Sequence, residues 1–362
     1  MQVEREIKHM FKKVQFQNFR GFQEISVSNL TKFNLISGKN NTGKTAFLEG
    51  LFLLAGAVRP NLTININSFR GLGVFDIEDK PKAERPWDSA FWNYDTEKSI
   101  KLLGIDLHKK SRTVTITAEQ LQSIRLETSS AESKDTRLAT PFPYGLRLVH
   151  EYGKKKATVF LRVDQEGAKV EPNLSIPMPA IFVLARTSQH PKEDAQRFGK
   201  LQVVKGEQLL LDALRTIEPR LKGITAVPIG DVSVLHGDIG APRLIPLPLM
   251  GGGTVRLTSI LLAIADAPKG VVFIDEIENG FHHTVLPSVW QAVRKLAMHT
   301  GTQIFATTHS LENIRAAHQV FKSSGDYSLS FYRLDRKDSE VLVRRYGKEI
   351  TQAAFEADLE MR

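Results

Sequence analysis

The feature that most constrains this chain is a short glycine-containing loop near its N-terminal end. Residues 38–45 read GKNNTGKT, which matches the pattern G-x-x-x-x-G-K-[ST] at every defined position. Glycines at this spacing let backbone N–H groups turn inward around phosphate oxygens, and the lysine adds a positive charge facing the same anion. The loop therefore predicts a nucleotide phosphate site, with a strand before it and a helix after it.

Both flanking elements are indicated by the apolar pattern. Phe33 to Ser37 is a short apolar run that predicts a strand ending at the loop. From Lys44 to Ala55, apolar residues recur at i, i+3 and i+4, which predicts an amphipathic helix. Lys44 would face the β and γ phosphates of ATP, and the Thr45 hydroxyl would ligate Mg²⁺. The residues that we expect to line the phosphates are Gly38, Asn40, Asn41, Thr42, Gly43, Lys44, Thr45 and Ala46.

A second apolar segment delivers two adjacent carboxylates. Residues 271–274 are apolar without alternation, which is typical of a strand buried on both faces of a parallel sheet, and Asp275 and Glu276 follow directly. Because α/β sheets place ligands at the carboxyl ends of their strands, we expect Asp275 to share Mg²⁺ with the loop threonine and Glu276 to polarise the attacking water. A further apolar strand, Gln303 to Ala306, leads to His309, which stands where a sensor of the γ-phosphate is needed.

Composition limits the compartment and the partners. The chain has 362 residues and no cysteine, which excludes disulfides and cysteine-ligated metals and favours a reducing cytoplasm. Its longest apolar candidate, residues 46–58, contains Glu49 and two glycines, so we predict no membrane span, and residues 1–13 lack the apolar core of a secretory signal. The net charge of +9 favours polyanionic partners such as nucleic acid, although a solvated basic face explains the scattered charges equally well.

The sequence divides into three segments. Residues 1–60 are expected to form an N-terminal β-subdomain with the phosphate loop, and residues 61–245 an inserted α/β lobe with a helical part. Residues 246–362 would complete a mixed central sheet and end in a hairpin. The fold class that follows is α/β. Strands are predicted around residues 14–16, 25–27, 146–150, 158–163, 329–334 and 341–346, and helices around 210–217, 257–264 and 286–297.

Taken together, the motifs resemble those of ABC-type ATPases of the RecF, SMC and OLD group. Residues 18–22 (NFRGF) before the loop are similar to the opening of these proteins, residues 274–281 (IDEIENGF) to their Walker B motif and D-loop, and residues 306–310 (ATTHS) to their switch-histidine segment. The similarity covers about residues 13–58 and 245–346. Within the group, the chain most resembles short bacterial ATPases found beside an effector protein in phage-defence operons.

The resemblance implies a P-loop fold of ABC type that uses ATP and Mg²⁺. It also implies that Arg20 contacts the phosphates and that a glycine triplet faces the γ-phosphate held by the other subunit. That triplet, which stands at the family's signature motif, is Gly251, Gly252 and Gly253, followed by Thr254. The signature serine is absent, so backbone N–H groups at the start of the next helix would have to bind the phosphate. The glutamine of the Q-loop stays open among Gln189, Gln23 and Gln202.

These features predict a slow cytoplasmic ATPase. Its head-to-tail homodimer would close on ATP and so time contact with DNA or a companion effector protein. One alternative is a P-loop kinase with residues 61–245 as its substrate lid, but Glu276 directly after Asp275, together with His309, favours the ATPase. A second alternative is a scaffold that binds ATP for assembly and hydrolyses little of it, which the incomplete signature favours. Neither the coiled-coil arms of SMC proteins nor the TOPRIM nuclease of OLD proteins is expected.

Overall fold

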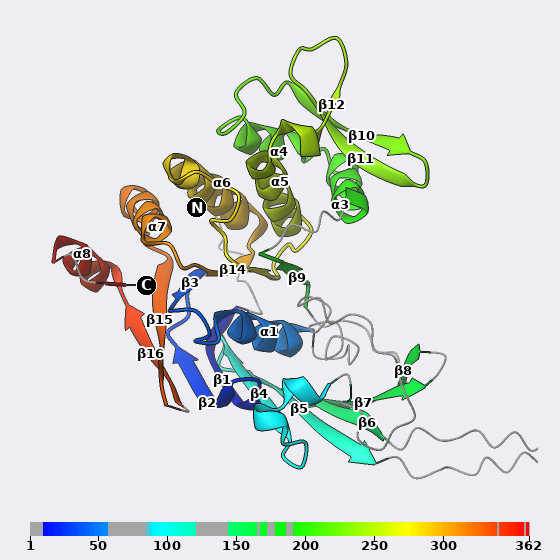
Figure 1. The fold of residues 1–362 in the computed structure, drawn as a ribbon, viewed down its shortest axis with the longest axis vertical. Helices are drawn as coiled ribbons and strands as arrows, with labels where there is room; N and C mark the ends of the chain where they lie inside the picture. The colour runs from blue at the N-terminus through cyan, green and yellow to red at the C-terminus, as the bar shows by residue number, and fades with distance from the viewer. Residues whose placement is uncertain are drawn as a thin grey trace, which may run out of the picture.

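The computed structural model describes residues 10–56, 85, 87–120, 144–164, 167–171, 178–185, 191–338, 340–357 and 360–361. The described elements form two large sheets with helix α1 between them, and a layer of helices covers the far face of the central sheet (Figure 1). A smaller three-stranded sheet lies beyond that helical layer. The two large sheets thus enclose helix α1, which begins at the phosphate loop.

The central sheet brings the predicted nucleotide motifs to one edge. Its six strands run in the order β16-β15-β3-β14-β13-β9, with β16 antiparallel to β15 and the other neighbours parallel. Every residue of β3, β13 and β14 is buried, as expected for strands covered on both faces. Because β14 lies between β3 and β13, the carboxyl ends of all three strands lie together. The bounds are β3 Phe33–Ser37, β9 Ala180–Val183, β13 Val271–Ile274, β14 Gln303–Thr307, β15 Leu329–Lys337 and β16 Glu340–Tyr346.

The second sheet is antiparallel and has seven strands in the order β2-β1-β4-β5-β6-β7-β8. The predicted N-terminal strand pair is confirmed, with Val14 opposite Val27. Strands β4 to β8 come from the segment that we assigned to an inserted lobe, yet β4 pairs with β1 and continues its sheet. The bounds are β1 Phe11–Phe19, β2 Phe22–Ser28, β4 Ile100–Asp106, β5 Ser111–Gln120, β6 Tyr144–Tyr152, β7 Lys155–Asp164 and β8 Gly167–Glu171.

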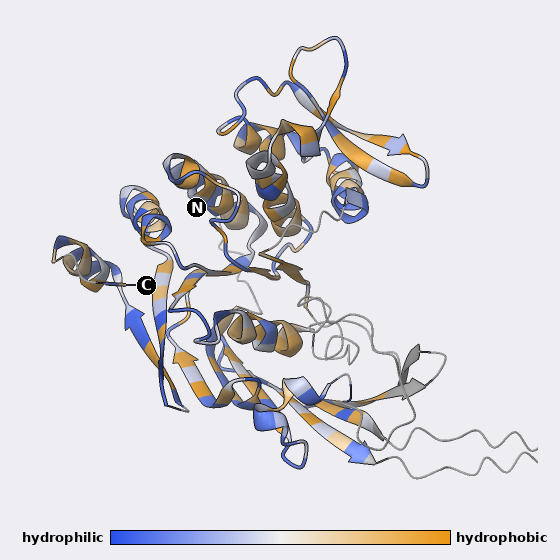
Figure 2. Ribbon diagram, viewed as in Figure 1, coloured by the Kyte–Doolittle hydropathy of each residue, from blue (hydrophilic) through white to orange (hydrophobic). Residues whose placement is uncertain are grey.

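Helix α1, Lys44–Ala55, lies between the two sheets, and the prediction that it is amphipathic is wrong. Eleven of its twelve residues are buried. Phe47 packs on Phe16 of the antiparallel sheet with ring centroids 5.4 Å apart, while Phe52 packs on Phe273 of the central sheet at 5.9 Å. Figure 2 shows apolar residues on the strands that face the helix from both sides. A helix covered on both sides needs apolar residues around its whole circumference.

Of the remaining helices, α5, α6 and α7 cover the opposite face of the central sheet (Figure 1), α3 and α4 pack against α5, and α8 lies against β15 and β16. Leu257, Ile260 and Ile264 of α5 are buried there, which confirms the predicted helix face. The bounds are α3 Pro191–Val203, α4 Glu207–Leu214, α5 Gly252–Ala265, α6 Leu286–Thr300, α7 Leu311–Ser323 and α8 Lys348–Glu356. The small sheet contains β10 Gly223–Ile229, β11 Val232–Asp238 and β12 Ile245–Pro246. Short 3₁₀ helices are η1 Asp88–Ala90, η2 Trp92–Tyr94, η3 Leu247–Met250 and η4 His283–Val285.

In the described part of the chain, the helices are too short or too polar for any of them to cross a bilayer.

Candidate nucleotide site

The phosphate loop has the backbone conformation that its glycines predict. Gly38, Asn41 and Gly43 all have positive φ angles, of 147°, 63° and 97°. A Cβ atom on Gly38 would come within 2.5 Å of the Leu334 carbonyl oxygen, and one on Gly43 within 2.7 Å of the Phe22 ring. Both positions therefore require glycine for conformation and for space. The loop connects β3 to the N-terminus of α1, an arrangement whose N–H groups and dipole suit a phosphate.

Lys44 lies over this loop. Its Nζ donates hydrogen bonds to the carbonyl oxygens of Gly38 at 2.7 Å and Lys39 at 3.0 Å, so the side chain folds back along the loop. Burial lowers the pKa of Lys44, and the nearby carboxylates, that of Glu276 foremost, oppose this shift. A positive charge in a desolvated position attracts a phosphate more strongly than one in bulk water.

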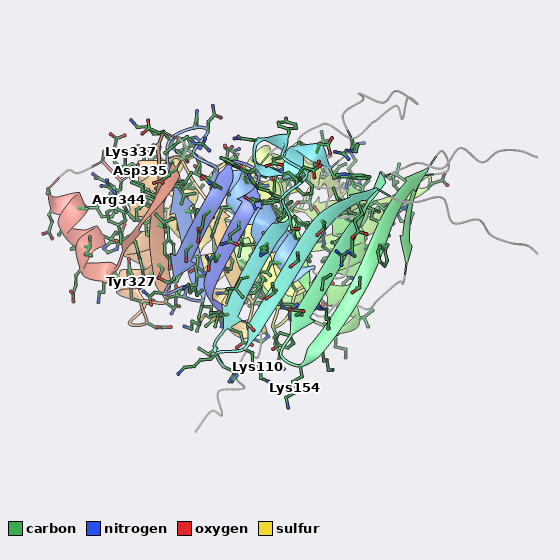
Figure 3. All side chains as sticks on the ribbon, turned by 90° about the horizontal axis from the view of Figure 1, so that it is seen from below. Lys110, Lys154, Tyr327, Asp335, Lys337 and Arg344 are labelled. Atoms are coloured by element: carbon green, nitrogen blue, oxygen red, sulfur yellow. The ribbon has the colours of Figure 1, made fainter. Side chains whose placement is uncertain are left out.

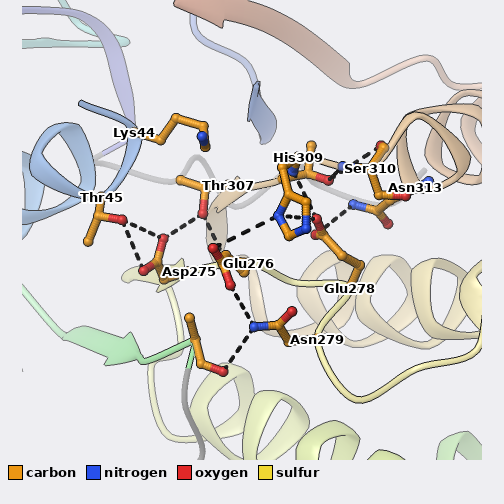
Figure 4. Close-up of polar contacts among 12 residues, drawn as sticks. Lys44, Thr45, Asp275, Glu276, Glu278, Asn279, Thr307, His309, Ser310 and Asn313 are labelled. Atoms are coloured by element: carbon orange, nitrogen blue, oxygen red, sulfur yellow. Dashed lines mark hydrogen bonds and ion pairs between the residues drawn. The ribbon is translucent and has the colours of Figure 1, made fainter. Parts of the chain in front are cut away.

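A hydroxyl and a carboxylate meet where Mg²⁺ was predicted (Figure 4). Thr45 Oγ1 is 3.1 Å from each carboxylate oxygen of Asp275, and Thr307 Oγ1 donates to Asp275 Oδ1 at 2.6 Å. Burial raises the pKa of Asp275, and the two hydroxyl hydrogen bonds oppose this shift. Oxygen ligands of this kind are the ones that Mg²⁺ prefers, and its usual protein sites supply only one or two carboxylates beside the substrate phosphates. The side chains present therefore fit that ion, which Thr45 and Asp275 would hold.

Glu276 is held in an unusual conformation next to Asp275. Its φ angle is +45°, which is uncommon for a residue other than glycine, and such strain is often found at functional sites. The Glu276 N–H donates to Thr307 Oγ1 at 2.7 Å, and its Oε2 accepts a hydrogen bond from Asn279 Nδ2 at 2.6 Å. The side chain is 37% exposed, so its carboxylate is oriented but still accessible to water.

His309 lies beside these carboxylates, after the end of β14. Its Nδ1 is 3.2 Å from Glu278 Oε1 and 3.9 Å from Glu276 Oε1, and its side chain is 51% exposed. Figure 4 shows the ring beside both glutamates, with Lys44 and Thr45 on the other side of Asp275 and Thr307. The structure thus gathers Lys44, Thr45, Asp275, Glu276 and His309 at one edge of the central sheet.

The glycine triplet lies on the surface at the start of α5. Gly251 and Gly252 are exposed, and an added Cβ atom on either would meet nothing within 4 Å. Gly253 is closer packed, because its Cβ would lie 3.1 Å from the Gly280 carbonyl oxygen. The N–H groups in the first turn of a helix have no partners within that helix, so this exposed end is suited to an anion.

Arg20 and the described Q-loop candidates do not take part in the contacts given above for this site. Arg20 Nε is 3.2 Å from Glu49 Oε2 on α1, and its Nη1 donates to the carbonyl and hydroxyl oxygens of Ser89 at 3.1 Å each. Its contact with phosphate stays a prediction. Gln23 on β2 and Gln202 on α3 are exposed, and Gln189 lies outside the described residues. The structure therefore assigns no Q-loop role to Gln23 or Gln202.

Four functional candidates escaped the sequence reasoning. Thr307, Glu278 and Asn279 position the carboxylates and the histidine, and all three lie inside the motif segments quoted above. Arg256 on α5 is 2% exposed, donates through Nη2 to the Asp275 carbonyl oxygen at 2.7 Å and through Nη1 to the Leu184 carbonyl oxygen. Burial lowers the pKa of Arg256 to about 10. Its position in an apolar helix offered no sequence signal for this contact.

This chain is similar to known proteins over most of its length. A family model described as "AAA domain, putative AbiEii toxin, Type IV TA system" matches residues 33–314. An ATP/GTP phosphatase of Helicobacter pylori is 23% identical over 380 residues, covering 96% of this chain and 98% of that protein. Protein MJECL10 of Methanocaldococcus jannaschii is 42% identical over 48 residues, which are 13% of this chain and 22% of that protein.

Solved structures confirm the predicted fold class. An SMC head bound to the C-winged helix domain of ScpA has a TM-score of 0.52 to this chain at 11% identity, covering 95% of this chain and 100% of that one. SMC heads are P-loop ATPase domains of ABC type, the class that the motifs predicted. The family match spans both halves of the nucleotide site. The chain therefore belongs to the AAA-domain family that includes putative AbiEii toxins of type IV toxin–antitoxin systems, and it has an ABC-type P-loop fold similar to that of an SMC head.

Proposed function

We propose that this protein is a Mg²⁺-dependent ATPase of ABC type. The observation that carries the proposal is the contact between Thr45 of the phosphate loop and Asp275 at the end of β13, with Glu276 following directly. The phosphate loop, the proposed metal ligands and the proposed general base thus lie together at one edge of one sheet, which supports this assignment. The name of the Helicobacter pylori relative, an ATP/GTP phosphatase, supports nucleotide hydrolysis as the reaction.

Each residue then has a defined role. The loop N–H groups and Lys44 bind the β and γ phosphates, and Thr45 with Asp275 hold Mg²⁺, which would neutralise charge on the phosphates when bound. Glu276 orients the attacking water and accepts its proton. Asn279 already occupies Oε2 of Glu276, which leaves Oε1 for this task.

Dimerisation gated by ATP is the second part of the proposal. Gly251, Gly252 and Gly253 stand at the exposed N-terminus of α5, where they would meet the γ-phosphate bound by a second copy of the chain. ATP would then join two subunits, and hydrolysis would release them. The absent signature serine favours the alternative of an assembly scaffold with little hydrolysis.

We further propose that the dimer acts in the cytoplasm on a companion effector protein, in DNA-linked defence or repair. The family description, which names toxin–antitoxin systems, supports such a partner, and the net charge of +9 is compatible with nucleic acid. Exposed basic side chains are spread over the antiparallel sheet and the hairpin. Figure 3 shows Lys110 and Lys154 at one end of this face and Lys337 and Arg344 at the other.

The test is the variant Glu276→Gln. It should retain ATP and Mg²⁺ but release phosphate on the order of a hundredfold more slowly, because it lacks the general base. Light scattering should then detect a dimer with ATP and a monomer without it, and Lys44→Ala should stay monomeric in both conditions. An oligomer that ignores ATP would support the scaffold instead. Normal phosphate release by Glu276→Gln would refute the assigned base.

A further inference from the structure

Glu278 is a buried carboxylate that the proposed reaction does not use. Its side chain is 9% exposed, and it lies two residues after the candidate base Glu276. Its Oε1 accepts a hydrogen bond from the His309 backbone N–H at 2.8 Å and lies 3.2 Å from His309 Nδ1. The same oxygen therefore holds both the backbone and the ring of His309 (Figure 4).

The other side of this carboxylate is fixed by the helical layer. Glu278 Oε2 is 3.4 Å from Asn313 Nδ2, and Asn313 Oδ1 accepts a hydrogen bond from Trp290 Nε1 at 2.8 Å. Ser310 Oγ caps α7 by accepting from the Asn313 N–H at 3.1 Å. Asn313 and Trp290 are both fully buried or nearly so, at 0% and 1% exposure. Packing of α6 against α7 thus determines where Glu278 points.

This geometry determines which nitrogen of His309 faces which group. An ionised carboxylate only accepts hydrogen bonds, so the proton on Nδ1 is directed at Glu278. Glu276 is too distant to compete, since 3.9 Å exceeds hydrogen-bonding distance. The nitrogen that carries a proton is determined by the bond that the other nitrogen makes, and Nε2 is left for the nucleotide.

We propose that Glu278 is the positioning residue for His309: it keeps the proton on Nδ1 and orients Nε2 toward the γ-phosphate. This inference rests on the proposed ATPase function. Because half of the His309 side chain is exposed, water would replace Glu278 if the carboxylate were removed, and the ring would lose its fixed orientation. Glu278 therefore acts through His309 and has no direct role on the phosphate.

The first test is a double-mutant cycle. Glu278→Ala should lower kcat by roughly 10- to 100-fold, the usual effect of removing a group that orients a functional histidine, with the Kd for ATP unchanged. In a His309→Ala background, the same substitution should cause no further loss of kcat, because the imidazole through which Glu278 acts is gone. Glu278→Gln keeps one oxygen acceptor and should restore part of the rate. An equal loss in both backgrounds would overturn the proposal, since it would indicate a structural role.

The matched control is Glu312→Gln. Glu312 is an exposed carboxylate in the first turn of α7, three residues after His309, and accepts a hydrogen bond from Ser310 Oγ at 2.8 Å. This variant therefore removes a neighbouring charge and leaves both contacts of Glu278 with His309 in place. It should keep the wild-type rate. If Glu312→Gln slows the reaction as much as Glu278→Gln does, the effect is general to the local charge and the proposal is wrong.

The second test does not depend on hydrolysis. Nitrogen-15 NMR of the imidazole, assigned with His309→Gln, should place the proton of neutral His309 on Nδ1 in the wild type. Glu278→Ala should move it to Nε2, the tautomer favoured in water. An unchanged tautomer would overturn the proposal. A wild-type chain that hydrolyses no ATP would refute the proposed function, whereas this spectrum would still decide the role of Glu278.

Discussion

The composite site is tested most directly at Gly252. A carboxylate introduced by Gly252→Asp should prevent ATP-dependent dimerisation while the monomer stays intact. In the monomer, nothing lies within 4 Å of a Cβ atom at this position, and the residue is the first of α5. An acidic residue in a first helical turn is usually stabilising, by about 0.3–1 kcal/mol. The neighbouring positions are less suitable, because Gly251 has a φ of 108° and a Cβ on Gly253 would meet a carbonyl oxygen.

The dimer would be affected very differently. Two unit charges about 4 Å apart interact by about 4 kcal/mol at the effective dielectric constant of a protein surface. The new Asp would lie at about this distance from the γ-phosphate bound by the partner subunit. A symmetric dimer has two such sites, so the repulsion occurs twice. Each 1.4 kcal/mol is a factor of about ten in an equilibrium constant, so dimer formation should weaken by about three orders of magnitude per site.

Light scattering with and without ATP measures dimerisation, and thermal denaturation checks the monomer. Gly252→Asn has the same shape without the charge and should dimerise far better than Gly252→Asp. Mixing Gly252→Asp with Lys44→Ala should restore part of the ATPase activity, because the mixed dimer contains one intact composite site. If Gly252→Asp hydrolyses ATP normally as a monomer, the composite site does not exist and a self-contained enzyme, such as the kinase alternative, gains support.

Three further predictions concern single residues. Lys44→Ala should weaken ATP binding at least tenfold, since a charge-assisted contact contributes about 1.5–3 kcal/mol, and calorimetry showing unchanged affinity would remove the loop from the site. Thr307→Val leaves the Glu276 N–H without its acceptor and should lower the free energy of unfolding by about 1–3 kcal/mol; equal denaturant midpoints would contradict this. Burial, followed by the guanidinium of Arg112, lowers the pKa of His150 from 6.5 to about 4. As pH falls, His150 is therefore protonated in the unfolded chain before it is protonated in the folded chain. The free energy of unfolding of the wild type should decrease by up to about 3 kcal/mol between pH 6.5 and about 4. The variant His150→Gln should not show this decrease. If the free energy of unfolding of the two proteins changes in parallel with pH, His150 is not the group responsible.

The amino-acid sequence alone was sufficient to predict the local features of the site. The order of Gly38, Gly43 and Lys44 predicts a phosphate loop, and the structure shows why glycine is needed at 38 and 43, where φ is 147° and 97°. The uninterrupted apolar run 271–274 predicts a strand buried on both faces, and Asp275 directly after it predicts a ligand at the sheet edge. The conformation of the loop and the burial of the strand are confirmed, because both depend on residues adjacent in the chain.

Long-range packing decided the rest. Helix α1 has an apolar side that an amphipathic pattern assigns to one core, but its other side is also buried, because β4 and β5 extend the antiparallel sheet beneath it. Arg20, between β1 and β2, contacts Glu49 only because this turn packs against helix α1. No periodicity within either segment reports that contact.

The orientation of the site residues has the same origin. The sequence by itself determined that a phosphate loop, two carboxylates and a histidine exist in this chain and follow strands of one sheet. Only the tertiary structure decided that Thr307 holds the Glu276 backbone and that Glu278 faces His309. Hydrogen-bond partners are chosen by distances between elements that are far apart in the chain, and those distances are established by how the sheets and helices pack.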